Sequence, residues 1–306
     1  MSPLQRLSAA ARTSLNDALR QRVAGPDAER RARAIWLSPG ERRFAAGDPV
    51  CRVHGHAGMY AGGIRALLLQ SLHPLAMAGV GEHSGFRGDP WGRLQRTSEF
   101  LAMTTFGPVE EARRILDRIN RVHTTVVGST ADGRPYSATD PHLLRWVHVA
   151  EIDSFLTAHQ RYARTPLTAA EADLYVDQTA WVAGELGIPD PPRTVRDLRS
   201  QLRSFGPELE SSAGARDVAR FLISEPPLPW AARPGFWLLV AGALEMLPPH
   251  ARDLLDLHLP RPLRPLEEPL LRYAAGPLGA LGTAAVGWAL GDPGDLRNAE
   301  GSSAVA

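Results

Sequence analysis

His123 occupies a position at which a helix would turn its side chain toward the protein interior. From Pro108 onward apolar residues recur at helical spacing, and His123 takes the one polar position in that series. The apolar positions of the series are Val109, Ala112, Leu116, Ile119 and Val126. A buried imidazole needs a hydrogen-bond partner or a metal. The spacing is therefore compatible with a core histidine bonded to a carbonyl group and also with a metal ligand.

A second set of reactive groups lies on the helix expected just before this one. Asp89-Pro90 is a capping residue followed by proline, which is typical of a helix start, and Gly107 should end the helix. Arg96 borders one face of this helix, on which four residues recur at steps of four, three and four. Those four residues are Arg93, Thr97, Phe100 and Thr104. This face therefore combines guanidinium and hydroxyl donors with an aromatic ring.

The charge balance argues against a nucleic-acid partner and against an anionic membrane surface. The 306 residues hold 34 basic and 33 acidic side chains, a net charge of +1, so no global field attracts polyanions. All the basic side chains are arginines, and they are not interleaved with aromatic residues along one face. A hydrophobic content of 44% is sufficient for a sizeable core.

The single cysteine, Cys51, excludes a disulfide within one chain and suits a reducing compartment. Residues 1–34 alternate arginine with alanine and leucine and lack the continuous apolar core of a signal peptide. We therefore expect a cytoplasmic protein. Residues 273–290 carry no charge, but their glycines and alanines predict a packed helix after Pro277 rather than a clear membrane span.

The chain as a whole predicts an all-α fold with a single globular multi-helix domain. Proline and glycine punctuate helical segments throughout, and no long run alternates like a half-buried strand. We expect an N-terminal helical arm at 1–40, a functional helical domain at 41–270, and an apolar helix with a flexible tail at 271–306. His73-Pro74 should interrupt the apolar helix expected over 60–78.

Turn and capping residues predict further boundaries. Residues 79–88 and 129–139 are expected to be loops, and the helix that carries His123 should end near Gly128. Further helix starts are expected at Asp140, at Thr168 with Glu171, and at Thr194 with Asp197.

Several standard sites are missing from the sequence. It contains no zinc-protease, nucleotide-binding, serine-hydrolase or calcium-loop motif, and no Glu-x-x-His pair of the di-iron kind. His54, His56, His73 and His83 have a spacing that matches no standard metal site, and no carboxylate lies at helical distance from them. We therefore expect no metal cluster from these four histidines.

Short motifs in order over residues 70–162 carry a resemblance to a known family. They are Leu72-His73-Pro74, Gly79-Val80, His83-Ser84-x-Phe86, Asp89-Pro90, Arg93-x-x-Arg96-Thr97, Phe106-Gly107, His123, Asp132-Gly133, Tyr136-x-Ala138 and Trp146-Val147-His148. Together they resemble the haem-dependent oxygenases that include the latex-clearing rubber oxygenases and the MpaB-type oxygenases of fungal meroterpenoid biosynthesis.

The resemblance implies a haem b buried between helices, with O₂ as co-substrate and an apolar small-molecule substrate. It identifies His123 as the proximal iron ligand, and a histidine on an apolar face is what axial ligation of haem needs. Arg96 stands where the rubber oxygenases have lysine. A guanidinium has no lone pair for iron, so Arg96 should instead bind a propionate or a polarised oxygen species.

Arg93 and Thr97 should supply further donors in the same place, and with Arg96 they form the expected catalytic group. Phe100 is expected beside the cofactor, and Leu101 and Phe155 are candidate pocket residues that are equally plausible as core. The rubber oxygenases also use a distal acid, but residues 64–78 contain no Asp or Glu, and Glu82 is the nearest. That departure puts isoprene cleavage in doubt and leaves the substrate open.

Other functions fit the same sequence. The chain could bind haem as a sensor or carrier without turnover, or keep the helical scaffold without haem. Within the enzyme class, an oxidase or desaturase fits as well as an enzyme that cleaves double bonds. His148 is compatible with a supporting role at the site or with helix packing, and His83 with ordering a loop. The sequence does not specify an oligomeric state.

Overall fold

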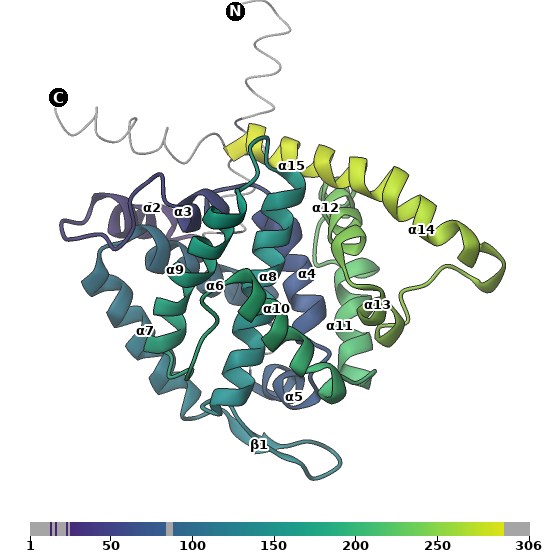
Figure 1. Ribbon diagram of the computed structural model, residues 1–306, viewed down its shortest axis with the longest axis horizontal. Coiled ribbons are helices and arrows are strands. Elements are labelled where there is room, and N and C mark those ends of the chain that lie inside the picture. The colour runs from purple at the N-terminus through teal and green to yellow at the C-terminus, as the bar shows by residue number, and fades with distance from the viewer. Residues whose placement is uncertain (1–12, 14–15, 17–22, 24, 84–87, 291–306) are drawn as a thin grey trace, which may run out of the picture.

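A computed structural model of the protein describes residues 13, 16, 23, 25–83 and 88–290, without the side chains of Glu82, His83 and Ala231 (Figure 1). This part of the chain is built almost wholly from helices, which confirms the all-α prediction. Part of the expected N-terminal arm lies outside the described residues. The expected C-terminal tail, after residue 290, lies wholly outside them. The predicted domain boundaries at 40 and 270 stay predictions.

The helices of the first half follow the proline and glycine punctuation of the sequence. They are α2 Ala28–Ala32, η1 Arg33–Leu37, α3 Pro49–His54, α4 Met59–Gln70, α5 Pro74–His83, α6 Pro90–Phe106, α7 Val109–His123 and α8 Pro141–Tyr162. A two-stranded antiparallel hairpin, β1 Val127–Ser129 and β2 Pro135–Ser137, lies between α7 and α8.

The second half contains further α-helices joined by short 3₁₀ and π segments. They are α9 Ala169–Glu185, α10 Val195–Ser204, η2 Gly206–Glu208, α11 Ala213–Ile223, η3 Trp230–Ala232, α12 Arg233–Met246, α13 Pro249–Leu254, η4 Arg261–Leu266, α14 Glu267–Leu270, η5 Leu271–Ala275 and α15 Gly276–Leu290.

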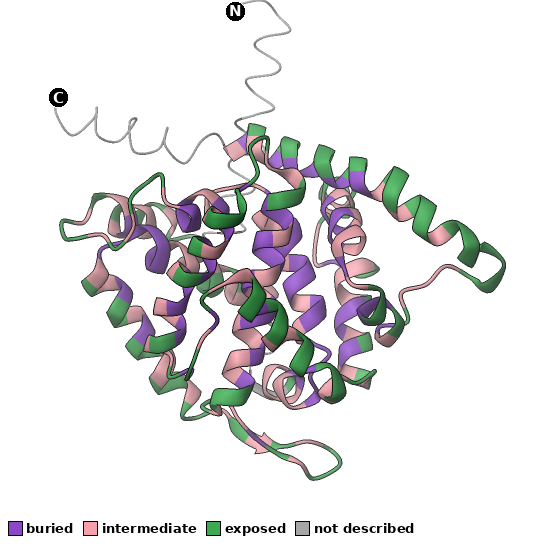
Figure 2. Cartoon of the chain, viewed as in Figure 1, coloured by how far each residue is buried: buried purple, intermediate pink, exposed green. Residues whose placement is uncertain are grey.

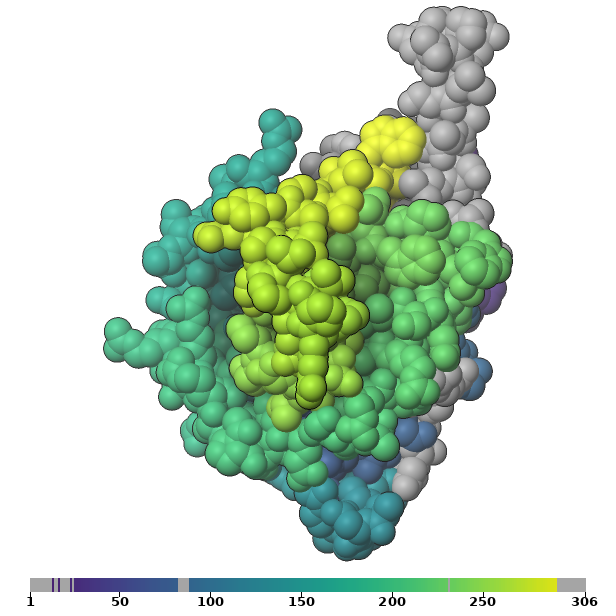
Figure 3. All heavy atoms as spheres, turned by 90° about the vertical axis from the view of Figure 1, so that its right-hand side faces the viewer, coloured from purple at the N-terminus to yellow at the C-terminus, as the bar shows by residue number. Residues whose placement is uncertain are grey.

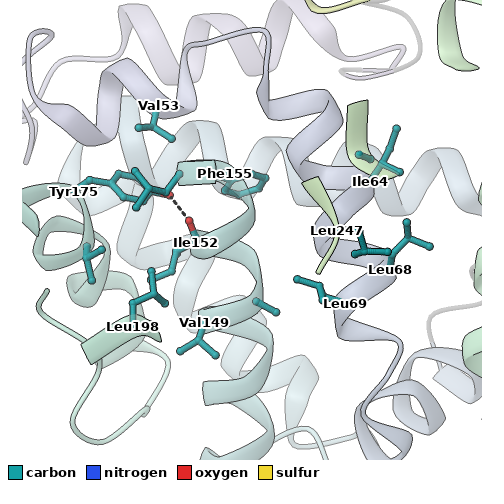
Figure 4. Close-up of a cluster of buried hydrophobic side chains, with 14 of the residues drawn as sticks. Val53, Ile64, Leu68, Leu69, Val149, Ile152, Phe155, Tyr175, Leu198 and Leu247 are labelled. Atoms are coloured by element: carbon teal, nitrogen blue, oxygen red, sulfur yellow. Dashed lines mark hydrogen bonds between the residues drawn. The ribbon is translucent and has the colours of Figure 1, made fainter. Parts of the chain in front are cut away.

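Helices α4 and α8 pack along each other at the centre of the molecule (Figure 1). Helix α12 also packs on α4, and α15 lies across α12. Residues buried on α4 and α8 form the middle of the core (Figure 2). Figure 4 shows Leu68 and Leu69 of α4 near Leu247, with Val149, Ile152 and Phe155 along α8.

The uncharged segment after Pro277 forms a helix packed on the surface, as predicted. α14 and α15 form a ridge along the outside of the molecule (Figure 3). Gly279 and Gly242 bring α15 and α12 together so closely that a Cβ on either glycine would overlap the backbone of the other helix. Among the described residues, none of the helices is both long and apolar enough to cross a membrane.

Helix starts were predicted well because capping chemistry is local. Asp89 accepts a hydrogen bond from the Gly92 N–H, and Asp140 accepts one from the His142 N–H. Thr168 and Thr194 each form a capping box with the acid three residues later. The expected break at His73-Pro74 separates α4 from α5.

Three local predictions were wrong. The segment 129–139 was expected to be a loop, but its ends take part in the pairing of β1 with β2 around the Asp132-Gly133 turn. Three-residue strands are too short to show an alternating pattern. Helix α7 ends at His123 instead of near Gly128, so Val126 belongs to the chain leaving the helix. Helix α5 continues through Gly79 to His83, where a loop was expected.

A buried ion pair ties the central helices together. The Arg65 guanidinium on α4 donates to Asp153 at 2.8 Å and to the Ser154 hydroxyl at 2.6 Å on α8, and its Nε donates to the Met246 carbonyl on α12 at 2.9 Å. The side chain of Arg65 is only 4% exposed, and that of Asp153 is 15% exposed. Removing one partner of such a pair leaves an uncompensated charge inside the protein.

We therefore expect Asp153→Asn to lower the free energy of unfolding by about 2 to 4 kcal/mol, because Arg65 stays charged and buried. Urea denaturation followed by circular dichroism measures this change. The control is Asp177→Asn, which removes the acid of an ion pair with Arg193 whose side chains are 49% and 60% exposed. That change should cost less than about 1 kcal/mol. Equal losses in the two variants would contradict the prediction.

Candidate functional site

Helices α6 and α7 position the residues singled out in the sequence. They pack against each other and are joined by Gly107 and Pro108 alone, with the Gly107 N–H bonded to the Met103 carbonyl. Arg93 lies near the start of α6 and His123 is the last residue of α7, so each is at the end of its helix away from the link.

His123 is the last residue of α7 and its side chain is half-buried. Leu116, two turns earlier on the same face, is fully buried, while the opposite face is charged and largely exposed. The Nδ1 atom of His123 is buried and has no hydrogen-bond partner in the described part of the chain. Burial lowers the pKa of this imidazole, so it is neutral at pH 7. A neutral ring with a free nitrogen is the form that ligates a metal.

The predicted residues of α6 do not share one environment. Arg93 is half-buried, and burial together with the charge of Arg96 lowers the pKa of its guanidinium. The Arg96 side chain is 61% exposed and pairs with Asp89 at 3.2 Å. Thr97 is exposed, and Phe100 is half-buried. The structure therefore turns Arg93 and Phe100 inward and leaves Arg96 and Thr97 outward.

Two titratable groups lie one turn apart on the central helix α8. Burial lowers the pKa of His148 to about 4 and raises the pKa of Glu151 to about 7. The Nε2 atom of His148 is buried without a partner in the described part of the chain. Both side chains nonetheless keep some accessible surface. Because these side chains keep some accessible surface although burial shifts their pKa values, this face of α8 can contact a bound molecule.

Glu151 was missed in the sequence, although a signal for it was present. His148 and Glu151 are three positions apart, which places them side by side on one helix face. The resemblance to the rubber oxygenases had placed the distal acid within residues 64–78, which contain none, with Glu82 as the nearest candidate. Glu82 lies in the last turn of α5, where its side chain is outside the described set.

His54 and Tyr175, two polar residues that pack against α8, have hydrogen-bond partners. The Nδ1 atom of His54 lies 2.8 Å from the Thr105 hydroxyl, and its Nε2 atom lies 3.3 Å from the Tyr175 hydroxyl. Burial lowers the pKa of His54 to about 3. The Tyr175 hydroxyl also donates to the Ile152 carbonyl at 3.5 Å (Figure 4). These contacts connect α3, α6, α8 and α9, so His54 has a structural role.

The histidines considered as a cluster in the sequence have separate surroundings. His54 binds Thr105 and Tyr175, while the His56 ring lies 5.3 Å from the His159 ring, centroid to centroid. His73 meets Glu208 instead of either of them. The structure gives no description of the His83 side chain.

The comparison with known protein families gives one match. The family described as "ER-bound oxygenase mpaB/B'/Rubber oxygenase, catalytic domain" matches residues 51–279, about three quarters of the chain. This range includes α6, α7 and α8 with all the residues described above. Neither the search of curated proteins nor that of solved structures found a match.

The raised pKa of Glu151 predicts a specific pH dependence. Folded Glu151 holds its proton up to pH about 7, whereas the unfolded chain releases it near the ordinary value of 4.5. The folded state thus binds more protons between these values, and stability falls as pH rises through this window. Between pH 5 and pH 8, the free energy of unfolding of the wild type should fall by about 1 to 3 kcal/mol more than that of Glu151→Gln. The lower end of this range allows for the accessible surface of the Glu151 side chain.

Urea denaturation of both proteins at the two pH values measures this difference. Subtraction removes the contributions of His54 and His148, because both proteins contain them. A matched control is Glu110→Gln, which changes a side chain that is 74% exposed and should alter the pH dependence much less. A stability difference between the wild type and the Glu151→Gln variant that stays constant with pH would contradict the prediction.

Proposed function

Because the chain belongs to the catalytic-domain family of ER-bound oxygenases and rubber oxygenases, we propose that it is a haem b-dependent oxygenase acting with O₂ on an apolar small molecule. Family membership supports an oxygenase with a small-molecule substrate. The haem, its ligand and the class of substrate are the parts proposed here. The unpartnered, buried ring nitrogen of His123 carries this proposal.

His123 suits the role of proximal ligand for three reasons. It projects from the apolar face of an amphipathic helix, it is neutral at pH 7, and its buried Nδ1 lacks a hydrogen-bond partner within the described residues. Buried polar atoms are nearly always hydrogen-bonded, so an orphaned atom calls for a ligand or a function. The alternative of a satisfied core histidine requires a carbonyl or hydroxyl partner for that nitrogen, which the described residues do not supply.

The arginines of α6 suit the charged edge of the same cofactor. Haem combines a large apolar ring with two propionates, and a guanidinium can bind a carboxylate through two parallel hydrogen bonds. Arg93 is half-buried near the start of α6, the helix that packs on the helix of His123, so we assign it to a propionate or to a polar group of the substrate. Arg96 and Thr97 are exposed and would act at the rim of the site, with Arg96 retaining its pairing to Asp89.

The substrate is proposed to be apolar because the inward residues of this region are apolar or neutral. Phe100 and Leu101 are half-buried on α6, and Phe155 is 4% exposed on α8. His148 is neutral at pH 7, and Glu151 is close to half protonated. Glu151 can accept or release a proton near neutral pH, which suits a general acid or base. Desolvating a charged substrate in such surroundings would cost several kcal/mol.

Haem, when bound, would supply the one-electron and O₂ chemistry that amino-acid side chains lack. The chain's own contribution would be an imidazole of His123 to hold the iron, cationic donors on α6 and a region with few formal charges. The shape of the site determines which atoms of a substrate can approach it. Family membership is compatible with cleavage, hydroxylation and desaturation of that substrate.

The decisive experiment is an absorption spectrum of the purified protein, as isolated and after reduction with dithionite. We expect a Soret band in the wild type that is lost or strongly shifted in His123→Ala. The band should persist in His148→Ala, which removes another inward histidine with an unpartnered ring nitrogen. The surface control is His250→Ala, on an exposed residue of α13.

Circular dichroism melts of each variant separate loss of haem from loss of fold. A band that survives in His123→Ala and disappears in His148→Ala would overturn the assignment of the ligand. A wild type that is colourless and takes up no added haemin would overturn the haem proposal and leave the haem-free scaffold. A haem protein that binds O₂ but consumes none with any apolar substrate would instead be a sensor or carrier.

A further inference from the structure

Three side chains from distant parts of the sequence meet at one end of the core. His73 precedes α5, His142 lies in the first turn of α8, and Glu208 ends η2. The Glu208 carboxylate lies 3.2 Å from Nε2 of His73, and 2.8 and 3.0 Å from Nε2 of His142 through its two oxygens. The three donor atoms all lie within 4.8 Å of one another.

Packing fixes the orientation of both imidazoles. Measured between ring centroids, His73 lies 6.2 Å from both Trp146 and Phe205, and His142 lies 4.6 Å from Phe205. The chain that carries the carboxylate is fixed as well, since the Glu210 N–H donates to the Leu72 carbonyl at 2.9 Å. The donors are therefore held by the fold, as a binding site requires.

The chemistry of the cluster suits a cation. It combines one carboxylate with two imidazoles, a set of donors that binds divalent transition ions. The guanidinium of Arg134, whose charge also acts on His73, pairs with Glu210 and Asp132 at 2.9 Å each. Its positive charge is thereby offset.

The geometry is close to that of a metal site with open positions. Ligands at about 2.1 Å from a tetrahedral ion are about 3.4 Å apart. The carboxylate contacts of 3.2 and 2.8 Å are within about 0.6 Å of that spacing, and the two imidazole nitrogens, at most 4.8 Å apart, would have to move together by at most about 1.4 Å. His73 is 2% exposed, whereas His142 and Glu208 are 49% and 41% exposed, so one side of the cluster faces solvent. Two histidines and one carboxylate with open positions form the donor set of mononuclear non-haem iron sites, and they also bind zinc.

We propose that His73, His142 and Glu208 bind one divalent first-row transition ion, at a site that shares no residue with the proposed haem site. In the metal-free protein each Nε2 atom donates its proton to the carboxylate. Ion binding moves the ring proton of each histidine from Nε2 to Nδ1 and so frees both Nε2 lone pairs for the ion. In the metal-free protein, Nδ1 of His73 is buried and has no partner in the described part of the chain. The ion would join α5, α8 and η2, and so stabilise the fold by binding the native state alone.

The test begins with protein stripped by a chelator and titrated with Zn²⁺ in a calorimeter. We expect one ion per chain, and an affinity that falls at least about 100-fold in His142→Ala and in Glu208→Gln. The matched controls are His250→Ala and Glu110→Gln, which lie outside the cluster and should bind as the wild type does. Saturating Zn²⁺ should raise the melting temperature of the wild type by at least about 3 °C, but not that of His142→Ala.

Co²⁺ gives a readout that does not depend on the variants. The wild type should develop visible d–d absorption bands on adding one equivalent of Co²⁺, as expected of an ion coordinated by imidazole and carboxylate groups. Absence of these bands would overturn the proposal, as would Zn²⁺ binding that is equally tight in Glu208→Gln and in wild type. Glu208 would then be only an acceptor bridging two imidazoles.

Discussion

Helix α8 is buried along much of its length, and this requires its inward polar groups to find partners inside the protein. Asp153 and Ser154 meet the requirement through Arg65, which also reaches α12. His148 and Glu151, only a few residues earlier, have pKa values shifted by burial, and the Nε2 atom of His148 has no partner among the described residues. One helix thus joins the core through some of its polar groups and offers others to a bound molecule.

The pKa shifts of this region follow from the same constraint. A charge without a partner is costly in a low-dielectric interior, so the buried groups near α8 take their neutral forms. His54 and His148 lose their protons, and Glu151 keeps its proton up to about pH 7. Glu151 is consequently the one of these three groups whose charge changes near neutral pH. A region that is nearly uncharged suits a large apolar ring, and in the proposed haem site the arginines of α6 would bind the charged edge of that ring.

Local chemistry explains why so much of the fold was predictable. The Asp89 and Asp140 caps and the two threonine capping boxes involve residues at most three apart, so a single sequence contains the whole interaction. Long-range pairings are different. His73, His142 and Glu208 are brought together by the packing of three elements, and no spacing in the sequence records that meeting. The hairpin of β1 and β2 was missed because three-residue strands show no pattern.

The face of α6 shows the limit of reasoning from helical spacing. Arg93, Thr97, Phe100 and Thr104 share one side of the helix, yet burial increases along its later part, from exposed Thr97 to Thr104 at 5% exposure. Spacing specifies direction around an axis, whereas burial also depends on how deep each turn lies in the fold. The helix therefore passes from charged and open in its first half to apolar and closed at its end. A cofactor with two charged groups on one edge of an apolar ring matches that gradient, and this supports placing its polar edge toward the start of α6.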